Sequence, residues 1–149
     1  MDIVDAKTRS KMMSHIRSKD TKPEMVVRKY LHHNGFRFRL HSSKLQGHPD
    51  LVLPKYKICI FIHGCYWHRH ENCKYASTPQ TRKEFWLQKF KNNIQRDIDV
   101  RETLISDGWR VIVIWECALK PKKAPETLIW LSDLISSLDF DYVESPLYA

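Results

Sequence analysis

The chain has 149 residues, of which 42% are hydrophobic and 28% charged, as expected for one soluble globular domain with a real core. Its net charge of +8 and pI near 9.4 favour a polyanionic partner, nucleic acid first, over a protein that is merely basic. No apolar run approaches the roughly 20 residues that span a bilayer, and the N-terminus lacks the hydrophobic stretch of a signal peptide. We therefore expect a cytoplasmic protein without membrane contact, whose four cysteines are metal ligands or buried thiols rather than disulfides.

The first 20 residues are strongly basic. Residues 5–18 can form a short helix with Met12, Met13 and Ile16 on a small apolar face. Two interpretations stand equal: a helix docked on the surface, and a basic arm that lies on phosphates and wedges a methionine between bases.

Residues 21–24 form a capping box with Pro23 in the first turn, so a helix should begin there and end near residues 34–35. Glu24 is first of all a capping residue. The buried face of this helix is expected to contain Val26, Val27, Tyr30 and Leu31.

Three strands are predicted next. Residues 36–40 alternate between apolar and polar side chains, residues 50–53 form a second short strand, and residues 58–63 are apolar and largely β-branched. With a turn at residues 54–57, these strands should form an antiparallel meander.

Residues 81–84 resemble a second capping box and open a long helix that reaches about residues 107–108. Asp97 lies close to its apolar face, where a charge needs a partner or a role. The inward positions are expected to be Trp86, Phe90, Ile94, Ile98 and Ile105.

Residues 109–115 are almost continuously apolar, which is typical of a central strand covered on both faces and reached by a crossover. A last amphipathic helix is predicted over residues 124–138, followed by a less ordered tail at 139–149. The whole chain, residues 1–149, is therefore expected to be one α/β domain with helices flanking a mixed sheet.

An acid and histidines suggest catalytic chemistry. Alternation places His63 on the face of Cys59 and Phe61, and the hairpin brings Asp50 opposite this region, so a carboxylate and an imidazole should meet at its open end. Asp50 and the carbonyl of Ile62 could hold Mg²⁺, which prefers hard oxygen ligands. The alternative without catalysis is that Asp50 is a turn residue that starts a strand. A further imidazole nearby, that of His68, favours a site suited to phosphodiester cleavage.

The same stretch carries a possible second metal site. Three thiols and an imidazole, namely Cys65, His70, Cys73 and the distant Cys117, could form a closed structural zinc site, with free thiols as the alternative. Cys59 is better interpreted as a buried small hydrophobe. Tyr66 and Trp67 lie in the polar loop beside these ligands, where aromatic rings could stack on or insert between bases.

Seven segments carry a resemblance to a known family: AKTRSKMM, KDTKPE, GHPDLVL, IFIHGCYWHRH, TRKEFW, NNIQRD and GWRVIVIWECAL. They occur in family order over residues 7 to about 119, and through them the chain resembles the very short patch repair (Vsr-like) T:G mismatch endonucleases. The resemblance implies a restriction-endonuclease-like α/β/α fold. It also implies Mg²⁺-dependent nicking of one strand 5′ to the thymine of a mismatch left by deaminated 5-methylcytosine.

The resemblance also implies roles for single residues. Asp50 matches the metal-binding aspartate, Ile62 sits where a backbone carbonyl binds the metal, and His63 and His68 match the active-site histidines, with His68 the better candidate base. Two acidic residues match positions that support the site: Glu24 and Asp97. Four residues match the structural zinc ligands: Cys65, His70, Cys73 and Cys117. Four residues match those inserted beside the mismatch: Met13, Tyr66, Trp67 and Trp86.

The chain departs from the family pattern at Tyr66, where a Phe is usual, at Arg69, which interrupts a His-rich run, and by one extra residue near 71–72. The expected partner is double-stranded DNA with a T:G mismatch, other mismatch-repair proteins are further candidates, and we expect a monomer. Three other hypotheses remain: a related restriction-type nuclease of other specificity, a zinc-stabilised DNA-binding module without catalysis and, last in order, a redox thiol protein.

Overall fold

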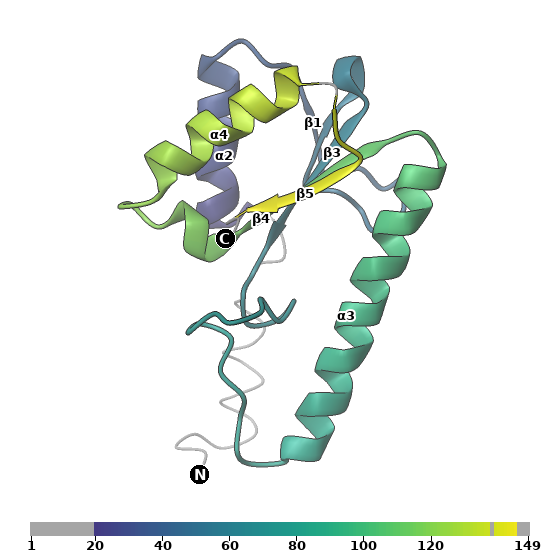
Figure 1. Ribbon diagram of the computed structural model, residues 1–149, viewed down its shortest axis with the longest axis vertical. Helices are drawn as coiled ribbons and strands as arrows, with labels where there is room; N and C mark the ends of the chain where they lie inside the picture. Colours follow the sequence, from purple (N-terminus) through teal and green to yellow (C-terminus); the bar gives the residue numbers. More distant parts are fainter. Residues whose placement is uncertain (1–19, 138, 146–149) are drawn as a thin grey trace.

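The computed structural model describes residues 20–137 and 139–145, which form a five-stranded mixed sheet with helices on both faces (Figure 1). The strands, which lie side by side in chain order, are β1 (Arg39–Leu40), β2 (Leu51–Leu53), β3 (Ile58–His63), β4 (Arg110–Trp115) and β5 (Tyr142–Ser145). The helices are α2 (Lys22–His33), α3 (Lys83–Ser106) and α4 (Ala124–Ser136), with short 3₁₀ turns at η1 (Pro54–Tyr56) and η2 (Glu116–Leu119). The α/β class and the mixed sheet predicted from sequence are confirmed.

The predicted meander is confirmed, because β1 pairs antiparallel with β2 and β2 with β3. The first strand is shorter than expected and spans only Arg39–Leu40. The reason lies in its partner: β2 ends at Leu53, and Pro54 begins the η1 turn, so residues 36–37 have no strand opposite them. Phe36 packs instead on Tyr56, with ring centroids 5.8 Å apart.

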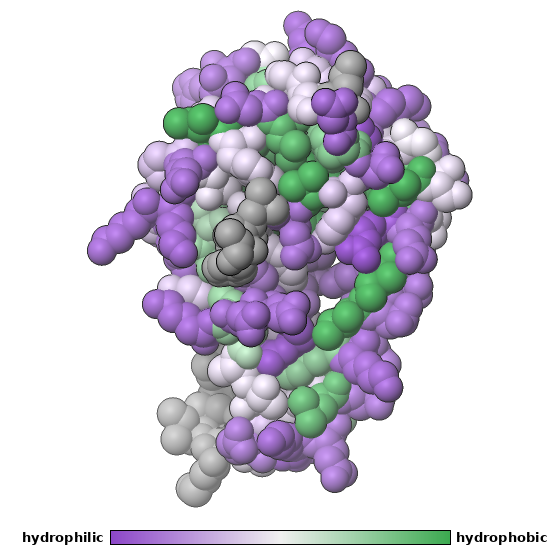
Figure 2. All heavy atoms as spheres, viewed as in Figure 1, coloured by the Kyte–Doolittle hydropathy of each residue, from purple (hydrophilic) through white to green (hydrophobic). Residues whose placement is uncertain are grey.

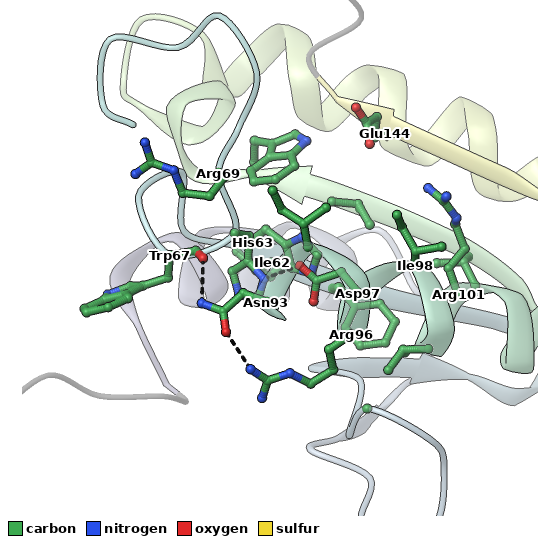
Figure 3. A pocket seen from close by; sticks show the side chains of 18 of the residues that line it. Ile62, His63, Trp67, Arg69, Asn93, Arg96, Asp97, Ile98, Arg101 and Glu144 are labelled. Atoms are coloured by element: carbon green, nitrogen blue, oxygen red, sulfur yellow. Dashed lines mark hydrogen bonds and ion pairs between the residues drawn. The ribbon is translucent and has the colours of Figure 1, made fainter. Parts of the chain in front are cut away.

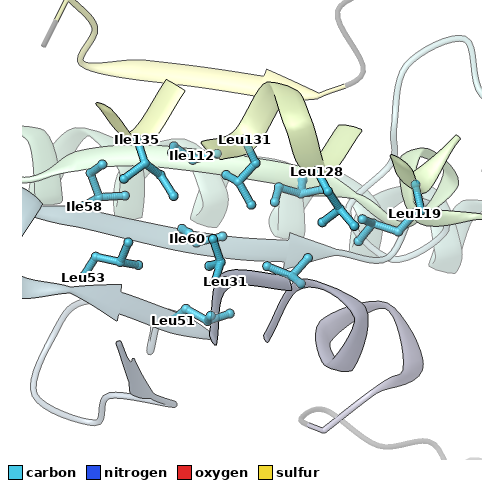
Figure 4. Packing of buried hydrophobic residues seen from close by; sticks show 13 residues of the cluster. Leu31, Leu51, Leu53, Ile58, Ile60, Ile112, Leu119, Leu128, Leu131 and Ile135 are labelled. Carbon is cyan, nitrogen blue, oxygen red and sulfur yellow. The ribbon is translucent and has the colours of Figure 1, made fainter. Parts of the chain in front are cut away.

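Strand alternation divides the core between the two faces of the sheet. Leu51, Ile60 and Ile112 face α2 and α4, where they pack with Leu31 and Leu131 (Figure 4). The intervening side chains form a second cluster on the α3 side, which contains Val52, Cys59, Phe61, Val111, Val113 and Trp115 with Val100 and Leu104 of α3. As predicted, β4 is buried on both faces and is joined to the parallel β3 by the helical crossover.

The two predicted capping boxes differ in outcome. Thr21 caps α2 and accepts a hydrogen bond from the Glu24 N–H at 3.3 Å, but the Glu24 carboxylate reaches back to the N–H of Asp20 rather than to that of Thr21. The second box is wrong: α3 starts after Arg82, whose backbone is left-handed (φ 54°), and no side chain caps it.

Only part of α3 packs on the sheet. Its buried residues are Phe90, Val100 and Leu104, whereas Ile94, expected to face inward, is exposed. Figure 1 shows the reason: the N-terminal half of α3 extends beyond the sheet, alongside the connection that follows β3. Ile94 therefore has no strand to cover, and hydrophobic side chains appear over this helix on an otherwise largely hydrophilic surface (Figure 2).

The expectation of a poorly ordered tail is wrong for residues 142–145, which form β5 and pair in parallel with β4. The guanidinium of Arg101 lies 4.2 Å from the centre of the Tyr142 ring and connects β5 to α3. Met13, the rest of the predicted arm before residue 20, Leu138 and residues 146–149 lie outside the described residues. Within the described ranges, no helix is both long enough and apolar enough to cross a bilayer.

Candidate active site and metal centre

Asp50 lies immediately before β2, at the open end of the β2–β3 hairpin. Because Leu51 pairs with Ile60, Asp50 falls opposite Phe61, as the hairpin register predicted. Its Oδ2 accepts a hydrogen bond of 2.7 Å from the backbone N–H of Ile62. The carboxylate therefore reaches across the hairpin and is fixed to the strand that carries His63.

Burial raises the pKa of Asp50 to about 6. The hydrogen bond from the Ile62 N–H opposes this rise, the charge of Glu24 adds to it, and His41 and His68 oppose it. A carboxylate with a raised pKa that lines a cleft is a favourable ligand for a hard cation, whose charge would offset the cost of burial. The donor chemistry at this position therefore fits magnesium.

The two candidate histidines stack on one another. The rings of His63 and His68 are 3.9 Å apart between centroids and nearly parallel, at 4°. His68 Nδ1 lies 2.7 Å from Oδ2 of Asp97, which confirms that the acidic residue on α3 has a partner. This pairing leaves Nε2 of His68 as the ring nitrogen available for proton transfer.

His63 occupies a different environment from His68. It is buried beside Trp115, with ring centroids 5.2 Å apart, and its Nδ1 has no hydrogen-bond partner among the residues that the structure describes. Burial, and secondarily the charge of His68, lower the pKa of His63 well below its usual value. His63 is therefore neutral near pH 7 and provides a flat, uncharged support for the His68 ring.

Glu24 is 1% exposed, and two basic side chains contact its carboxylate. Both of its carboxylate oxygens lie within 3.0 Å of His41 Nε2, and Arg28 approaches at 3.3 Å. Sequence reasoning missed His41, which lies between the first two predicted strands. The pairing of the first two strands could have indicated it. Extending the Leu40–Leu51 pair by one residue brings His41 opposite Asp50, and the backbone N–H of His41 donates to the backbone carbonyl of Asp50 at 3.0 Å.

The predicted zinc ligands come together. The ligand atoms of Cys65, His70, Cys73 and Cys117 all lie within 4.8 Å of one another, so this cluster could hold a metal ion. His70 Nδ1 is 3.6 Å from the sulfur of Cys65 and 3.4 Å from that of Cys117, separations close to those around one tetrahedral ion with Zn–S and Zn–N bonds of roughly 2.3 and 2.1 Å. Burial lowers the pKa of His70, which favours the neutral imidazole that binds metals.

Two neighbours connect this cluster to the sheet. Glu116, next to Cys117, accepts a hydrogen bond from the Cys65 N–H at 3.2 Å. The indole of Trp115 stacks on His70, with centroids 4.3 Å apart, and its edge meets His63. Trp115 therefore lies between the possible metal site and the candidate catalytic histidines.

The loop aromatic residues gather against the N-terminal half of α3. Tyr66 meets Trp67 and Phe90 edge to face, with centroids 4.9 and 5.3 Å apart, and Trp67 lies 6.1 Å from Trp86. The structure thus brings together the three described aromatic residues that were predicted to insert beside the mismatch. The fourth predicted residue, Met13, lies outside the described part of the chain.

A cleft of about 940 Å³ lies between α3 and the sheet, and Asp50, His63, His68 and Asp97 all line it. Asn93, also missed from sequence, donates from Nδ2 to the Trp67 carbonyl at 3.1 Å (Figure 3). Asn93 and Asp97 are one helical turn apart, so a single face of α3 holds two consecutive loop residues, Trp67 and His68.

Comparison with known families matches residues 1–74 to one described as DNA mismatch endonuclease Vsr. Individual relatives extend the similarity over most of the chain. The type II nicking enzyme V.NmeAIP of Neisseria meningitidis is 46% identical over 121 residues, which are 81% of this chain and 86% of that enzyme. The type II nicking enzyme V.XorIIP of Xanthomonas oryzae is 41% identical over 125 residues, 84% and 91% of the two chains. The DNA mismatch endonuclease Vsr of Escherichia coli is 42% identical over 122 residues, 82% and 78% of the two chains.

Proposed function

The chain belongs to the DNA mismatch endonuclease Vsr family, and we propose that it nicks one DNA strand 5′ to the thymine of a T:G mismatch. The net charge of +8 suits a duplex substrate. The relatives named as nicking enzymes support cleavage of a single strand. The observation that carries the proposal is the shared cleft, in which the partly buried carboxylate of Asp50 and the carboxylate-paired imidazole of His68 face the same space.

Asp50 and the backbone carbonyl of Ile62 would hold the catalytic magnesium. The ordered, partly buried carboxylate of Asp50 supports this assignment. When bound there, the ion would supply Lewis-acid stabilisation for the charge that develops on the phosphodiester.

Side chains of the protein accept the proton that the attacking water releases. His68 accepts the proton of the attacking water at Nε2, while Asp97 holds Nδ1 and stabilises the imidazolium that forms. Neutral His63 keeps the His68 ring in place through stacking. Glu24, paired with His41 and Arg28, lies near Asp50 and supports the site electrostatically.

Zinc at Cys65, His70, Cys73 and Cys117 would fasten the loop to the end of β4, because Cys117 follows that strand in η2. The loop would then present Tyr66 and Trp67, with Trp86, to the distorted base pairs, and Met13 would enter from the basic arm.

For the whole chain, residues 1–149, we propose a single restriction-endonuclease-like domain that acts as a monomer in the cytoplasm. Its support is the family membership and the mixed sheet covered by helices on both faces. Double-stranded DNA with a T:G mismatch is the proposed substrate, with other mismatch-repair proteins as further candidate partners.

The test is a nicking assay with Mg²⁺ on T:G and T:A duplexes that are otherwise identical. Wild-type protein should nick the T:G duplex, and Asp50→Ala should abolish nicking while leaving duplex binding intact. Equal nicking by Asp50→Ala would refute the mechanism. Cleavage of the T:A duplex at a similar rate would favour a restriction-type nuclease, and tight binding without cleavage in Mg²⁺ or Mn²⁺ would favour a DNA-binding module.

A further inference from the structure

The guanidinium of Arg69 makes four hydrogen bonds although Arg69 lies in an irregular loop. It stands between His68 and His70 with a left-handed backbone (φ 57°). Its Nη1 donates to the carbonyls of Tyr66 at 3.2 Å and Ser77 at 2.9 Å, and its Nη2 donates to the carbonyl of Ala76 at 2.8 Å and to Thr78 Oγ1 at 3.0 Å. The planar guanidinium fork thus ties two parts of the chain together in a way that a point charge cannot.

The same guanidinium lies on the aromatic cluster. Its central carbon is 4.0 Å from the centre of the Phe90 ring and 5.5 Å from that of Tyr66. Phe90 is buried on α3 and meets the edge of Tyr66. Arg69 therefore connects three elements: the 66–70 loop, the 76–78 segment and the N-terminal half of α3.

The 76–78 segment is neither helix nor strand, because it belongs to the irregular connection between Cys73 and α3. Regular backbone hydrogen bonding therefore does not hold it in place. The proposed metal site would fix this connection at Cys73, and the hydrogen bonds to Arg69 fix it three to five residues further on. Arg69 therefore links this connection to Tyr66, because the same guanidinium donates to the Tyr66 carbonyl and lies 5.5 Å from the centre of the Tyr66 ring.

We infer that Arg69 is a positioning residue that holds the Tyr66–Trp67 pair ready to enter a mismatched duplex. This inference rests on the proposed function, because it assigns Arg69 a part in mismatch recognition. We call the hydrogen bonds of Arg69 to residues 76–78 and its stacking on Phe90 and Tyr66 the clamp. Without the clamp, the aromatic pair and the 76–78 segment must be ordered when DNA binds, and that entropy cost weakens binding to the mismatch.

Arg82 provides a matched control. It is also an arginine with a left-handed backbone (φ 54°), and it stacks on an aromatic ring, that of Phe85, at 4.5 Å. Within the described residues, however, the Arg82 side chain makes no hydrogen bond to the 76–78 segment. Arg82→Ala therefore reproduces the loss of charge, of stacking and of a left-handed arginine, but not the loss of the clamp.

The first measurement is the ratio of affinities for T:G and T:A duplexes without Mg²⁺, with 2-aminopurine beside the mismatch as a reporter of unstacking. Arg69→Ala should lower the ratio about tenfold and reduce the unstacking signal, whereas Arg82→Ala should weaken both duplexes alike and keep the ratio. Arg69→Lys, which keeps the charge but lacks the fork, should lose nearly as much as Arg69→Ala and serves as the test if Arg69→Ala does not fold. A wild-type ratio in Arg69→Lys would overturn the inference.

The second measurement needs no DNA. Amide hydrogen exchange across residues 74–80 should be faster in Arg69→Ala than in wild type and unchanged in Arg82→Ala. Equal protection in the two variants would overturn the clamp whatever the substrate is. If instead the wild-type protein does not prefer the mismatch, the proposed function fails while the exchange measurement still decides whether Arg69 holds the segment.

Discussion

At the scale of single residues, Asp50 combines a functional position with a thermodynamic cost. Burial raises its pKa to about 6 in the folded protein, from 3.8 for the free side chain. The folded state therefore holds this proton over a pH range in which the unfolded chain has released it. As pH rises from about 4 to about 6, the free energy of unfolding should fall by about 3 kcal/mol, and it should then stay at the lower value.

We therefore predict that Asp50→Asn stabilises the protein without Mg²⁺ while abolishing nicking. Asparagine can still accept the hydrogen bond from the Ile62 N–H but carries no buried charge. Urea unfolding at pH 8 should give a gain of up to about 3 kcal/mol, and the gain should shrink towards pH 4.5. Added Mg²⁺ should stabilise wild type and leave Asp50→Asn unchanged; equal stabilisation of both would contradict the assignment of Asp50 as the metal ligand.

At the scale of elements, α3 has two tasks divided along its length. Its C-terminal end covers the sheet through Val100 and Leu104, while its middle holds the loop through Asn93 and Asp97. The polar connection before β2 also contacts α3, because Gly47 lies against Val100. This contact places α3 next to the segment that leads into Asp50.

Gly47→Ala should disturb that contact. An added Cβ would lie 2.4 Å from Val100 Cγ1, and the backbone at Gly47 is left-handed (φ 77°). Gly35→Ala is the matched control, since Gly35 has a similar φ of 80° with nothing within 4 Å. We expect Gly47→Ala to lower the free energy of unfolding by about 1–3 kcal/mol more than Gly35→Ala, because Val is stiff and overpacking is costly. Thermal or urea unfolding of both variants measures the difference. Equal losses of unfolding free energy would show that the Val100 side chain moves aside at no measurable cost.

At the scale of the whole molecule, the proposed metal cluster joins segments that are distant in the chain. Cys65 and Cys117 are more than 50 residues apart, yet their sulfurs both approach His70. A metal there would connect the loop after β3 to η2, which follows β4 and contains Cys117. Trp115, the last residue of β4, stacks on His70 of this cluster. The catalytic and DNA-contacting parts of the loop would then share one support.

Removing zinc should therefore inactivate the protein indirectly. Protein stripped with a chelator and returned to Mg²⁺ alone should be destabilised by at least about 3 kcal/mol and should not nick, whereas Mg²⁺ with one equivalent of zinc should restore both properties. Cys73→Ser should bind zinc more weakly, while the buried thiol of Cys59, outside the cluster, can be changed to Ala without loss of bound metal. Full nicking by the stripped protein with Mg²⁺ alone would show that the cluster is not needed.

Several features were predictable because they depend on local pattern. The alternation in residues 58–63, the apolar run of β4 and the cap at Thr21 each report a structure that neighbouring residues determine. The hairpin register followed from the short turn, so the approach of Asp50 to the end of β3 was also predictable. The cluster of three cysteines and a histidine was predictable in outline, because ligand chemistry limits which residues can share an ion.

Other features depend on how the elements pack, which no local pattern reports. Residues 142–145 became a strand because the exposed edge of β4 offered hydrogen bonds to pair with. The His41–Glu24 pair and the stacking of Arg69 on Phe90 join residues that only the folded chain brings together. The sequence by itself determined which side chains could do chemistry and on which strands they lie. The tertiary structure decided which of them touch, because contacts between distant segments are selected by packing in three dimensions.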